Sequence, residues 1–515
     1  MHRLNLLLHH LKYLSLAILL LLTSGCNNTV DRLPSTTKDY CGNIIDKPAT
    51  SLSQQLAPIA DKMKEKTGVY LLEQGTEAIL TRAWLTEYAE QTIDVQYFIF
   101  STDNIGLIAS DYLIQAADRG IRVRILVDDI MIDARGDELL LLDAHENLSI
   151  RIYNPLANIG KNLFQKVANL ITDFHNFNQR MHNKTFTVDG KVSITGGRNI
   201  ADEYFGYDHA FNFRDRDVLL IGGEVKAVQR SFDEFWNDSL SVPISQLVPK
   251  EYKKPSYQAL HQYACDPVNF LPEIRAQIYN MPETIKAIQS GNTLHWLNNI
   301  EYVSDKPGKN TQHKFLGGGG LSTQRLIDLV KTAKHSITIQ TPYLITTELS
   351  QNLFKELIDN GVEIKILTNS IASNDNFDAF NGYQRVRKSL LEIGVEIYEF
   401  KPDAQIRRKV MSEEMYRKLD TMPIFTLHAK SMVIDDKITV IATFNLDPRS
   451  ANLNTESITI IPSTEIAKQV KTGMLIEMQP ENAWHTTLDW NPDHLVKTST
   501  QLKVKIRRII PKSIL

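Results

Sequence analysis

Two stretches of the chain decide its fold: residues 180–199, RMHNKTFTVDGKVSITGGRN, and residues 427–445, LHAKSMVIDDKITVIATFN. Each contains the pattern His-x-Lys-x4-Asp, and each has an asparagine ten residues after the aspartate. The residues between lysine and aspartate, TFTV and SMVI, are mostly β-branched or apolar, as in buried strands. One such pattern could arise by accident, but two copies with matching asparagines indicate an internal duplication.

The spacing within each motif predicts where its side chains point. Because successive strand side chains point to opposite faces, His182 and Lys184 share one face. Asp189 and Gly190 predict a tight hairpin, whose return strand brings Asn199 back toward the histidine. The second copy repeats the pattern with His428, Lys430, Asp435 and Asn445.

The segments ahead of each motif also repeat. A strand, a helix, a glycine suited to a left-handed helix end and a second strand follow one another, and the order returns about 240 residues later. Strands alternating with helices predict an α/β fold in both halves. Asp128 and Asp129, at the end of one strand, are either a feature of the site or a solvated strand end, and the solvated end is favoured. In the first copy the strand, helix, glycine and second strand are 93–100, 105–119, Gly120 and 121–129. In the second copy they are 337–345, 348–360, Gly361 and 362–370.

The repeat predicts two domains, 60–240 and 313–490. Between them, residues 241–312 are rich in proline and poor in periodic signal, which favours a linker or insertion. The four glycines of Gly317–Gly320 favour a flexible joint over a phosphate-binding loop, because no Lys-Ser or Lys-Thr follows them. Residues 491–515 form a basic tail, which either lies on an anionic membrane or is a plain solvated end.

Residues 1–26 are typical of an export signal and not of a folded domain. A basic start is followed by an apolar run and by TSGC, ending at Cys26. The Gly-Cys ending resembles a bacterial lipobox, in which the cysteine is lipidated, although Thr23 stands where leucine is usual. An uncleaved membrane anchor stays open, because residues 4–22 are about long enough to span a bilayer. Both interpretations predict attachment to a membrane of the cell envelope, and the lipoprotein would face the periplasm, with inner or outer membrane undecided.

Composition narrows the function. The chain has 515 residues, with 57 Lys and Arg against 60 Asp and Glu, so no basic footprint indicates nucleic-acid binding. Three cysteines exclude a disulfide scaffold. In an exported protein Cys41 and Cys265 either pair or remain as two buried thiols. No HExxH motif or Cys/His cluster is present, so neither a metal nor another cofactor is expected.

The residue types of the motif suit chemistry at a phosphodiester. The oxygens of an anionic phosphate need cations and amide donors as charge shifts in the transition state, and the motif lysines and asparagines supply both. One imidazole can attack phosphorus, while the other protonates the departing oxygen. Each histidine needs a carboxylate to fix its tautomer, and the candidates are Asp217 and Glu456. Asp189 and Asp435 are expected to stabilise the hairpins and to contact no substrate.

The paired motifs resemble the phospholipase D superfamily. The runs 93–100 (IDVQYFIF), 180–206 (RMHNKTFTVDGKVSITGGRNIADEYFG) and 444–456 (FNLDPRSANLNTE) are similar to bacterial cardiolipin synthase C-like proteins. The resemblance implies two α-β-α sandwich domains, each a mixed sheet flanked by helices. They would form a pseudo-twofold pair with one active site at the interface. It also implies a phosphohistidine mechanism and transfer of a phosphatidyl group to an alcohol, making cardiolipin from phosphatidylglycerol and another phospholipid.

The resemblance assigns roles by position. His182 would be the nucleophile and His428 the acid and base, although pseudo-symmetry allows either histidine to attack. Glu456 would be the carboxylate behind the second histidine, and Asp217 is a weaker match, because an insertion precedes it. The phosphate-binding positions are Lys184, Asn199, Lys430 and Asn445.

The chain departs from the family pattern before each asparagine, where the family usually has Gly-Ser. The first copy has Gly196 and Gly197 and so lacks the hydroxyl, while the second has Ala442 and Thr443 and keeps it. Asp436 replaces the usual glycine after the motif aspartate, a change that a turn tolerates.

Other functions remain open. A hydrolytic phospholipase D or phosphodiesterase would use the same residues with water as acceptor, and a nuclease is disfavoured by the net charge of −3. An inert envelope lipoprotein that uses the fold for binding is disfavoured by two intact motifs. The expected partners are a phospholipid substrate and a membrane surface, without nucleic acid, and the expected state is a monomer with an internal pseudo-dimer.

Overall fold

The computed structural model describes residues 51–131, 137–156, 159, 174–248, 256–279, 294–311, 317–411 and 422–515. The predicted leader 1–26, with Cys26, and Cys41 lie outside these ranges. Cys265 is disulfide-bonded. Within the described ranges, no helix has both the length and the apolar character needed to cross a membrane.

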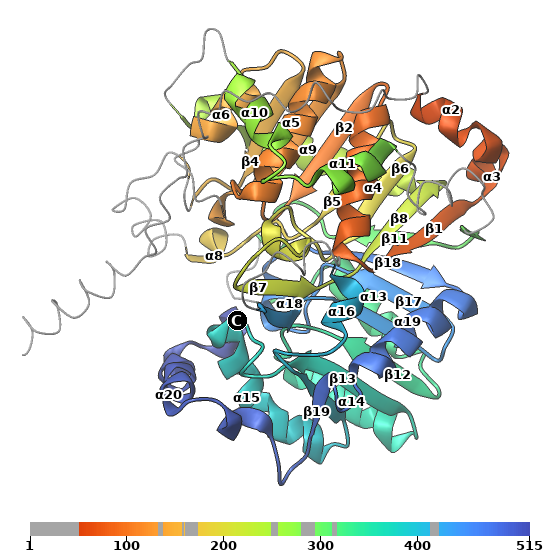
Figure 1. Ribbon diagram of the computed structural model, residues 1–515. Coiled ribbons are helices and arrows are strands. Elements are labelled where there is room, and N and C mark those ends of the chain that lie inside the picture. The colour runs from red at the N-terminus through yellow and green to blue at the C-terminus, as the bar shows by residue number, and fades with distance from the viewer. Residues whose placement is uncertain are drawn as a thin grey trace, which may run out of the picture.

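The first half of the chain is built on a nine-stranded mixed sheet (Figure 1). In sheet order its strands are β10 (His295–Leu297), β1 (Thr67–Leu72), β8 (Asp217–Gly222), β6 (Val192–Gly196), β5 (Thr185–Val188), β2 (Thr92–Tyr97), β3 (Arg122–Asp128), β4 (Leu148–Tyr153) and β9 (Ser241–Pro243). β2, β3 and β4 run parallel, as strand-helix-strand units require. The motif hairpin β5–β6 pairs antiparallel with β2 on one side and β8 on the other.

The second half repeats this arrangement in an eight-stranded sheet, whose order matches the first from β1 to β9. The strands are β11 (Glu301–Ser304), β18 (Ser457–Pro462), β17 (Ile438–Ala442), β16 (Ser431–Ile434), β12 (Ser336–Gln340), β13 (Glu363–Asn369), β14 (Glu396–Phe400) and β19 (Ala483–Thr486). Two mixed α/β sheets in one chain confirm the predicted fold class. Gly120 and Gly361 have φ of 88° and 87°, in agreement with the predicted left-handed helix ends.

Helices cover both faces of each sheet (Figure 1). In the first half, α4 (Gly75–Tyr88) and α5 (Asn104–Asp118) cover the outer face of the sheet and contribute residues to its core. In the second half, α13 (Leu321–Val330), α14 (Glu348–Asp359) and α15 (Phe377–Glu392) do the same. The other α-helices within the described residues are α2 (Leu52–Leu56), α3 (Ala60–Glu65), α6 (Asp137–Asp143), α8 (Phe174–Phe177), α9 (Val225–Asn237), α10 (Gln258–Cys265), α11 (Pro272–Tyr279), α16 (Arg407–Val410), α18 (Pro448–Asn452), α19 (Thr464–Glu477) and α20 (Thr498–Ile506).

The two halves share an apolar core that positions the site. α9 and α19 present apolar residues at helical spacing, and Val228 and Val470 pack in one cluster with strands of both sheets. In the same cluster, Leu220 of β8 lies with Ile441 of β17. A two-stranded parallel sheet, β7 (Phe211–Arg214) with β15 (Ile424–Leu427), also joins the halves.

The segment 241–312 contributes to both halves where it is described. α10 and α11 pack in the core of the first half, for example through Leu260 and Ile274, and β10 extends the first sheet. β11 belongs to the second sheet. The basic tail forms α20, whose Val504 is buried in the core of the second half.

Candidate active site

His182 lies just before β5, in a segment that pairs with the other half. Met181 forms an isolated parallel bridge with Thr455, and the backbone N–H of His182 donates to the Thr455 carbonyl at 3.0 Å. The next residue, Glu456, is fully buried, and its Oε2 lies 2.9 Å from Nδ1 of His182. Backbone and side-chain contacts therefore join the two halves at this histidine.

His428 is positioned in the same manner on the opposite side. In the parallel pair β7–β15, Arg214 stands opposite Leu427, so the residues that follow these two strands meet side by side. These residues are Asp215 and His428. The N–H of His428 donates to the Arg214 carbonyl at 2.8 Å, and Nδ1 of His428 lies 2.6 Å from Oδ2 of Asp215.

The prediction that Asp217 stands behind a histidine is wrong, because Asp215 has that position. Asp217 begins β8 inside the first half, where it accepts a hydrogen bond from Nη2 of Arg82 at 2.8 Å and lies 3.5 Å from Arg198. The two aspartates are two residues apart, and only the end of β7 decides that Asp215 reaches His428.

The prediction that Glu456 supports the second histidine is also wrong, because it supports the first. Each histidine is thus paired with a carboxylate from the other half of the chain. The Thr443 hydroxyl donates to Oε2 of Glu456, so the hydroxyl that the second motif retains orients this carboxylate. The sequence predicted that each histidine would be supported by a carboxylate from its own half. Nothing in the spacing of the motifs indicated that the carboxylates are exchanged between the halves.

The motif lysines are buried beside their histidines. Nζ of Lys184 donates to the His182 carbonyl at 2.8 Å, and Nζ of Lys430 donates to the His428 carbonyl at 2.6 Å. Nζ of Lys430 also lies 3.3 Å from Nε2 of His428. Burial lowers the pKa of Lys184 to about 7 and that of Lys430 to about 8. An anionic phosphate in the site would favour their charged forms.

Both histidines are neutral at pH 7. Burial lowers the pKa of His182 to about 4, and Glu456 opposes this shift while the neighbouring lysines add to it. Burial, together with Lys430, lowers the pKa of His428 to about 3. Burial opposes the ionisation of Asp215, but its contact with His428 lowers the pKa of this carboxyl below its usual range. Neutral imidazoles beside carboxylates have the lone pair that attack on phosphorus requires.

The motif asparagines occupy matching positions but make different contacts. Asn199 accepts from the Ile99 N–H at 3.0 Å and donates to the Tyr204 hydroxyl at 2.7 Å. Asn445 is 5% exposed, and its Oδ1 is buried without a hydrogen-bond partner among the described residues. The ring of Tyr204 packs edge-on against His428, with ring centroids 5.1 Å apart.

The motif aspartates stabilise the hairpin ends, as predicted. The carboxylate of Asp189 accepts from three consecutive backbone N–H groups, those of residues 90–92, at 2.7–2.9 Å. Asp435 accepts in the same way from residues 334–336 at 2.7–3.0 Å. Both have positive φ, 53° and 51°, and Asp436 tolerates a φ of 56° in place of the usual glycine. Each aspartate thus joins its hairpin to the start of the neighbouring strand.

Asp128 is a positioning residue, although the sequence favoured a solvated strand end over a feature of the site. It was expected to be solvated, but it is fully buried and accepts from the Met181 N–H at 2.7 Å. Arg180 lies 3.3 Å away and shares this buried environment. Asp129 is also buried and accepts from the Ile159 N–H at 2.7 Å. Asp128 therefore supports the backbone immediately before His182.

Two arginines flank Asp215 and connect the halves. Nε of Arg214 donates to Oε1 of Glu477 in α19 at 2.7 Å. Nε of Arg216 donates to Glu73 at 2.7 Å, and its Nη1 donates to Gln340 of β12 at 2.8 Å. Because charge-assisted bonds of this kind are strong when buried, they hold the loop that presents Asp215.

Gly197 has a steric role that the sequence pattern left open. A side chain there would collide with the carboxylate of Asp215. The missing hydroxyl of the first motif is therefore tied to the space that Asp215 needs.

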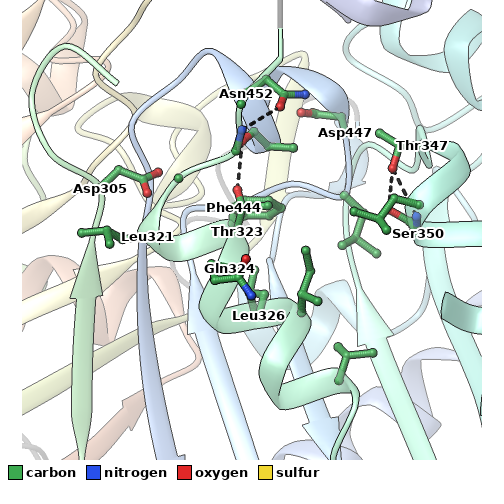
Figure 2. Close-up of a pocket in the computed structure, with 18 of the residues that line it drawn as sticks. Asp305, Leu321, Thr323, Gln324, Leu326, Thr347, Ser350, Phe444, Asp447 and Asn452 are labelled. Atoms are coloured by element: carbon green, nitrogen blue, oxygen red, sulfur yellow. Dashed lines mark hydrogen bonds between the residues drawn. The ribbon is translucent and has the colours of Figure 1, made fainter. Parts of the chain in front are cut away.

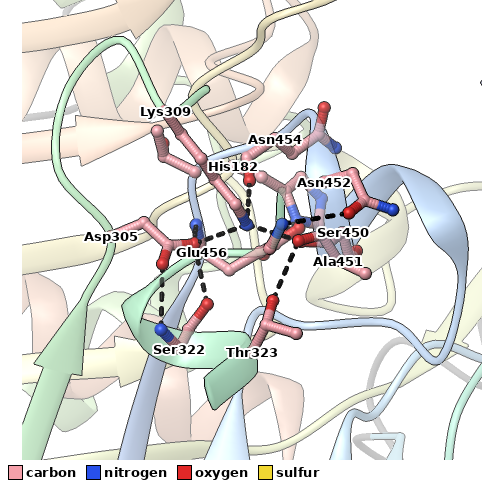
Figure 3. Close-up of polar contacts among 12 residues, drawn as sticks. His182, Asp305, Lys309, Ser322, Thr323, Ser450, Ala451, Asn452, Asn454 and Glu456 are labelled. Atoms are coloured by element: carbon pink, nitrogen blue, oxygen red, sulfur yellow. Dashed lines mark hydrogen bonds and ion pairs between the residues drawn. The ribbon is translucent and has the colours of Figure 1, made fainter. Parts of the chain in front are cut away.

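Figure 3 shows the contacts on the far side of Glu456. The N–H of Glu456 donates to Oδ2 of Asp305 at 3.0 Å, and Nζ of Lys309 donates to the same oxygen at 2.8 Å. The Ser322 hydroxyl donates to it as well, at 2.7 Å. This buried cluster connects Glu456 to the first turn of α13.

The described residues include no group of three His, Cys, Asp or Glu side chains arranged to hold a metal ion. The site consists instead of two His–carboxylate pairs and two buried lysines, whose charges act on one another across the interface. Such a set can bind a phosphate diester, attack its phosphorus and protonate the departing oxygen.

Comparisons with known proteins agree with this geometry. The model of the family described as "Cardiolipin synthase, PLD-like domain" matches residues 85–236 and 326–475. The chain therefore belongs to the phospholipase D superfamily. Within that superfamily it belongs to the cardiolipin synthase PLD-like family and is an enzyme of the phosphatidyltransferase class.

Individual relatives span most of the chain. It is 34% identical to cardiolipin synthase C of Escherichia coli, over 85% of this chain and 90% of the relative. It is 30% identical to an uncharacterised protein of Helicobacter pylori, over 90% and 88% of the two chains. The crystal structure of a phosphatidylserine synthase from Haemophilus influenzae aligns with a TM-score of 0.57 at 14% identity. It covers 90% of this chain and 100% of the other, and this likeness shows the fold alone.

Proposed function

We propose that this enzyme transfers a phosphatidyl group to the hydroxyl of a second lipid, making cardiolipin from phosphatidylglycerol and another phospholipid. The observation that carries the proposal is the crossed pairing of His182 with Glu456 and His428 with Asp215, each close to a buried motif lysine. The 34% identity to cardiolipin synthase C of Escherichia coli supports the substrate class.

In the first step, Nε2 of His182 attacks phosphorus and forms a P–N bond, while the P–O bond to the departing alcohol breaks. The anionic phosphate of the bound lipid, together with Asp215, favours the protonated form of His428, which then donates its Nε2 proton to this alcohol oxygen. Nζ of Lys430 lies 3.1 Å from Nδ1 and 3.3 Å from Nε2 of His428, so it contacts the ring without selecting one nitrogen. The choice of His182 as the attacking group rests on the positional match to the family.

In the second step, His428 takes the proton from the acceptor hydroxyl, whose oxygen attacks phosphorus. The P–N bond to His182 breaks, and the imidazole is regenerated. Glu456 keeps Nδ1 of His182 oriented throughout and stabilises the positive charge on the ring. Lys184 and Lys430 offset the negative charge that develops on the phosphate oxygens.

The test is product analysis with the purified full chain. Vesicles of labelled phosphatidylglycerol, with and without phosphatidylethanolamine, are incubated with the enzyme, and lipids are separated by chromatography. Labelled cardiolipin is the expected product in at least one mixture. Phosphatidic acid with no cardiolipin in either mixture would show that water is the acceptor and would overturn the proposed transfer.

We also propose that the protein is a periplasm-facing lipoprotein lipidated at Cys26. The disulfide at Cys265 supports an oxidising compartment, since disulfides are rare in the cytosol. Metabolic labelling with radioactive palmitate tests the anchor. Label should enter the wild type and be lost in Cys26→Ser, while Cys41→Ser, the matched control, keeps it. Equal label in Cys26→Ser would contradict lipidation there.

We further propose that the C-terminal region contacts the membrane surface. Large apolar side chains are exposed along it, at 56% for Leu502, 60% for Ile506 and 86% for Ile509, among basic residues. The double variant Leu502→Ser and Ile509→Ser should sediment less with anionic vesicles. Val268→Ser, which removes a similarly exposed side chain elsewhere, should sediment as the wild type does. Equal sedimentation of all three proteins would contradict the proposal.

We propose, finally, that the enzyme works as a monomer, with its single site between the two halves. Light scattering on the purified full chain should give the mass of one chain.

A further inference from the structure

The second half contains a cavity of about 820 Å³ that the proposed reaction does not use (Figure 2). It lies between α13, α14, the start of β16 and the segment after β17. Its volume is in the range of small-molecule sites, ~300–1,000 Å³. Its apolar lining includes Leu326, Val330, Leu353, Phe354, Met432 and Phe444.

The equivalent place in the first half is filled. There the cavity is only about 30 Å³, although most of the residues that line it have counterparts in the lining of the larger cavity. Phe186 stands where the second half has Met432, each four residues after a motif histidine. Phe270, from the segment between α10 and α11, packs edge-on against Tyr112 of α5 and closes the space, with ring centroids 6.4 Å apart. The duplicated fold therefore does not require an open cavity here.

The charged residues of the lining are already paired. Lys309 donates to Asp305 and to the carbonyls of Ser450 and Asn454, at 2.8–3.0 Å. Asp447 accepts from the Ser450 N–H at 2.6 Å. Lys306 lies 3.5 Å from Glu234. Burying an additional charge against such walls is unfavourable, so the buried part of a ligand must be uncharged and apolar.

The mouth and the floor of the cavity differ in a way that suits an amphiphile. Leu349 is 61% exposed, and the cavity is also lined by Thr347 and Ser350, whose hydroxyl groups lie 3.0 Å apart (Figure 2). Leu326 and Phe444 are almost fully buried. A molecule with a polar head and a long apolar tail would place its tail inside and leave its head in water.

We propose that this cavity binds one acyl chain of a membrane phospholipid, at a site separate from the phosphoryl site. The cavity shares a wall with the active site, because Asp305 lines it and contacts the backbone of Glu456. The proposed site holds an apolar chain and takes part in no bond-breaking step. It rests on the proposed function only for the choice of phospholipid as probe.

Photo-crosslinking tests the proposal. The probe is phosphatidylglycerol with a diazirine at the end of one acyl chain, and it makes up a small fraction of the lipid in phosphatidylglycerol vesicles. The full-length protein is mixed with these vesicles, illuminated and digested for mass spectrometry. Crosslinks are expected on peptides of α13 and α14. A diazirine fatty acid in a parallel arm distinguishes a free fatty acid from a phospholipid. Stronger labelling of these peptides by the free acid would overturn the phospholipid assignment.

Substitutions in α14 test whether the acyl chain lies in this cavity. Leu353→Trp fills the cavity and should lower the α13–α14 crosslink at least about tenfold, equivalent to ~1.4 kcal/mol of binding free energy. Lys355→Trp, on the exposed face of the same helix, is the matched control and should leave it unchanged. His182→Ala should also leave it unchanged, which separates this site from the proposed chemistry.

If Leu353→Trp lowers the thermal unfolding midpoint, Leu349→Asp supplies the test, because this exposed side chain can change without disturbing the core. It puts a charge at the mouth and should lower the crosslink as well. Wild-type crosslinking in the folded cavity variants, or crosslinks confined to peptides outside the cavity, would overturn the proposal.

Discussion

The two halves of this enzyme have the same motif and the same strand order, yet they orient their histidines differently. The first half supplies Asp215, a short carboxylate that fits because Gly197 leaves it room. The second half supplies Glu456, a longer carboxylate that receives a hydrogen bond from Thr443. The difference shows that the pseudo-twofold axis relates the positions of the groups but not their environments. Two chemically similar histidines can therefore have different roles.

The interiors of the halves differ in the same way. Two residues after its carboxylate, the first half has Asp217, buried with Arg82 and Arg198, whereas the second half has the apolar Ile458. At the position just before the motif asparagine, the first half has Arg198 and the second half has Phe444, which lines the open cavity. Charged pairs are therefore buried in one half, and an apolar cavity is open in the other.

The largest expected effect comes from removing either histidine. His182→Ala and His428→Ala should each lower turnover at least about 10⁴-fold, as in other units of nucleophile and base. His209→Ala, an exposed histidine, is the control and should keep wild-type turnover. Reactions with labelled phosphatidylglycerol that are quenched with detergent at alkaline pH, where the P–N bond of a phosphohistidine survives, sharpen the comparison. The wild type should retain a labelled covalent species, and His182→Ala should not. A labelled His182→Ala protein would reassign the nucleophile to the second half.

The crossed carboxylates should have the next largest effect. Asp215→Asn and Glu456→Gln are each expected to lower kcat by about 10²–10⁴-fold with the fold retained, because the imidazole loses its orientation and charge support.

Asp217→Asn is the matched control for Asp215→Asn, and it should act on stability. It leaves Arg82 and Arg198 without their carboxylate, at a cost of ~3–5 kcal/mol in the free energy of unfolding. Urea denaturation and kcat of the folded protein separate the two effects. A large loss of kcat in Asp217→Asn with unchanged stability would restore the uncrossed assignment.

The two lysines predict opposite pH dependences of activity and stability. With pKa values of about 7 for Lys184 and about 8 for Lys430, kcat/KM should fall as pH rises through this range, because the cations are lost. In the unfolded chain these lysines titrate near ~10.4. Between pH 7 and 10 the unfolded state thus binds more protons, and the two lysines make stability rise with pH.

Kinetics and urea unfolding, both measured from pH 6 to 9, check this prediction. Lys184→Arg should remove the lower part of the alkaline fall in kcat/KM, and Lys430→Arg the upper part. A kcat/KM that increases from pH 7 to 9 would contradict the requirement for cations.

The smallest expected effects come from the motif aspartates, where the halves are most alike. Asp189→Ala and Asp435→Ala should each lower the free energy of unfolding by ~1–3 kcal/mol, because three backbone N–H groups lose their acceptor. The kcat of folded protein should change little. Asp436→Gly, by contrast, should raise stability by up to ~1 kcal/mol, since glycine adopts positive φ without strain. Unequal losses in the two alanine variants would show that the hairpins are not equivalent.

Much of the fold and part of the site could be predicted from local pattern. The alternation of apolar residues and the Asp189–Gly190 turn predict the hairpin β5–β6, because strand period and turn geometry depend on residues near in sequence. His182 and Lys184 were found in the same way. Asp128 was expected in solvent, because no local pattern shows that a strand end is covered by a distant loop.

The sequence by itself determined the duplication, the α/β class and the identity of the histidine, lysine and asparagine motifs. These follow from composition, spacing and strand period. Only the tertiary structure decided that Asp215 and not Asp217 meets His428, and that Glu456 crosses to His182. The physical reason is that both contacts arise where a segment of one half pairs in parallel with a segment of the other, at β7–β15 and at Met181–Thr455. The open cavity has the same origin, because Phe270, distant in sequence from the motifs, closes only the first half.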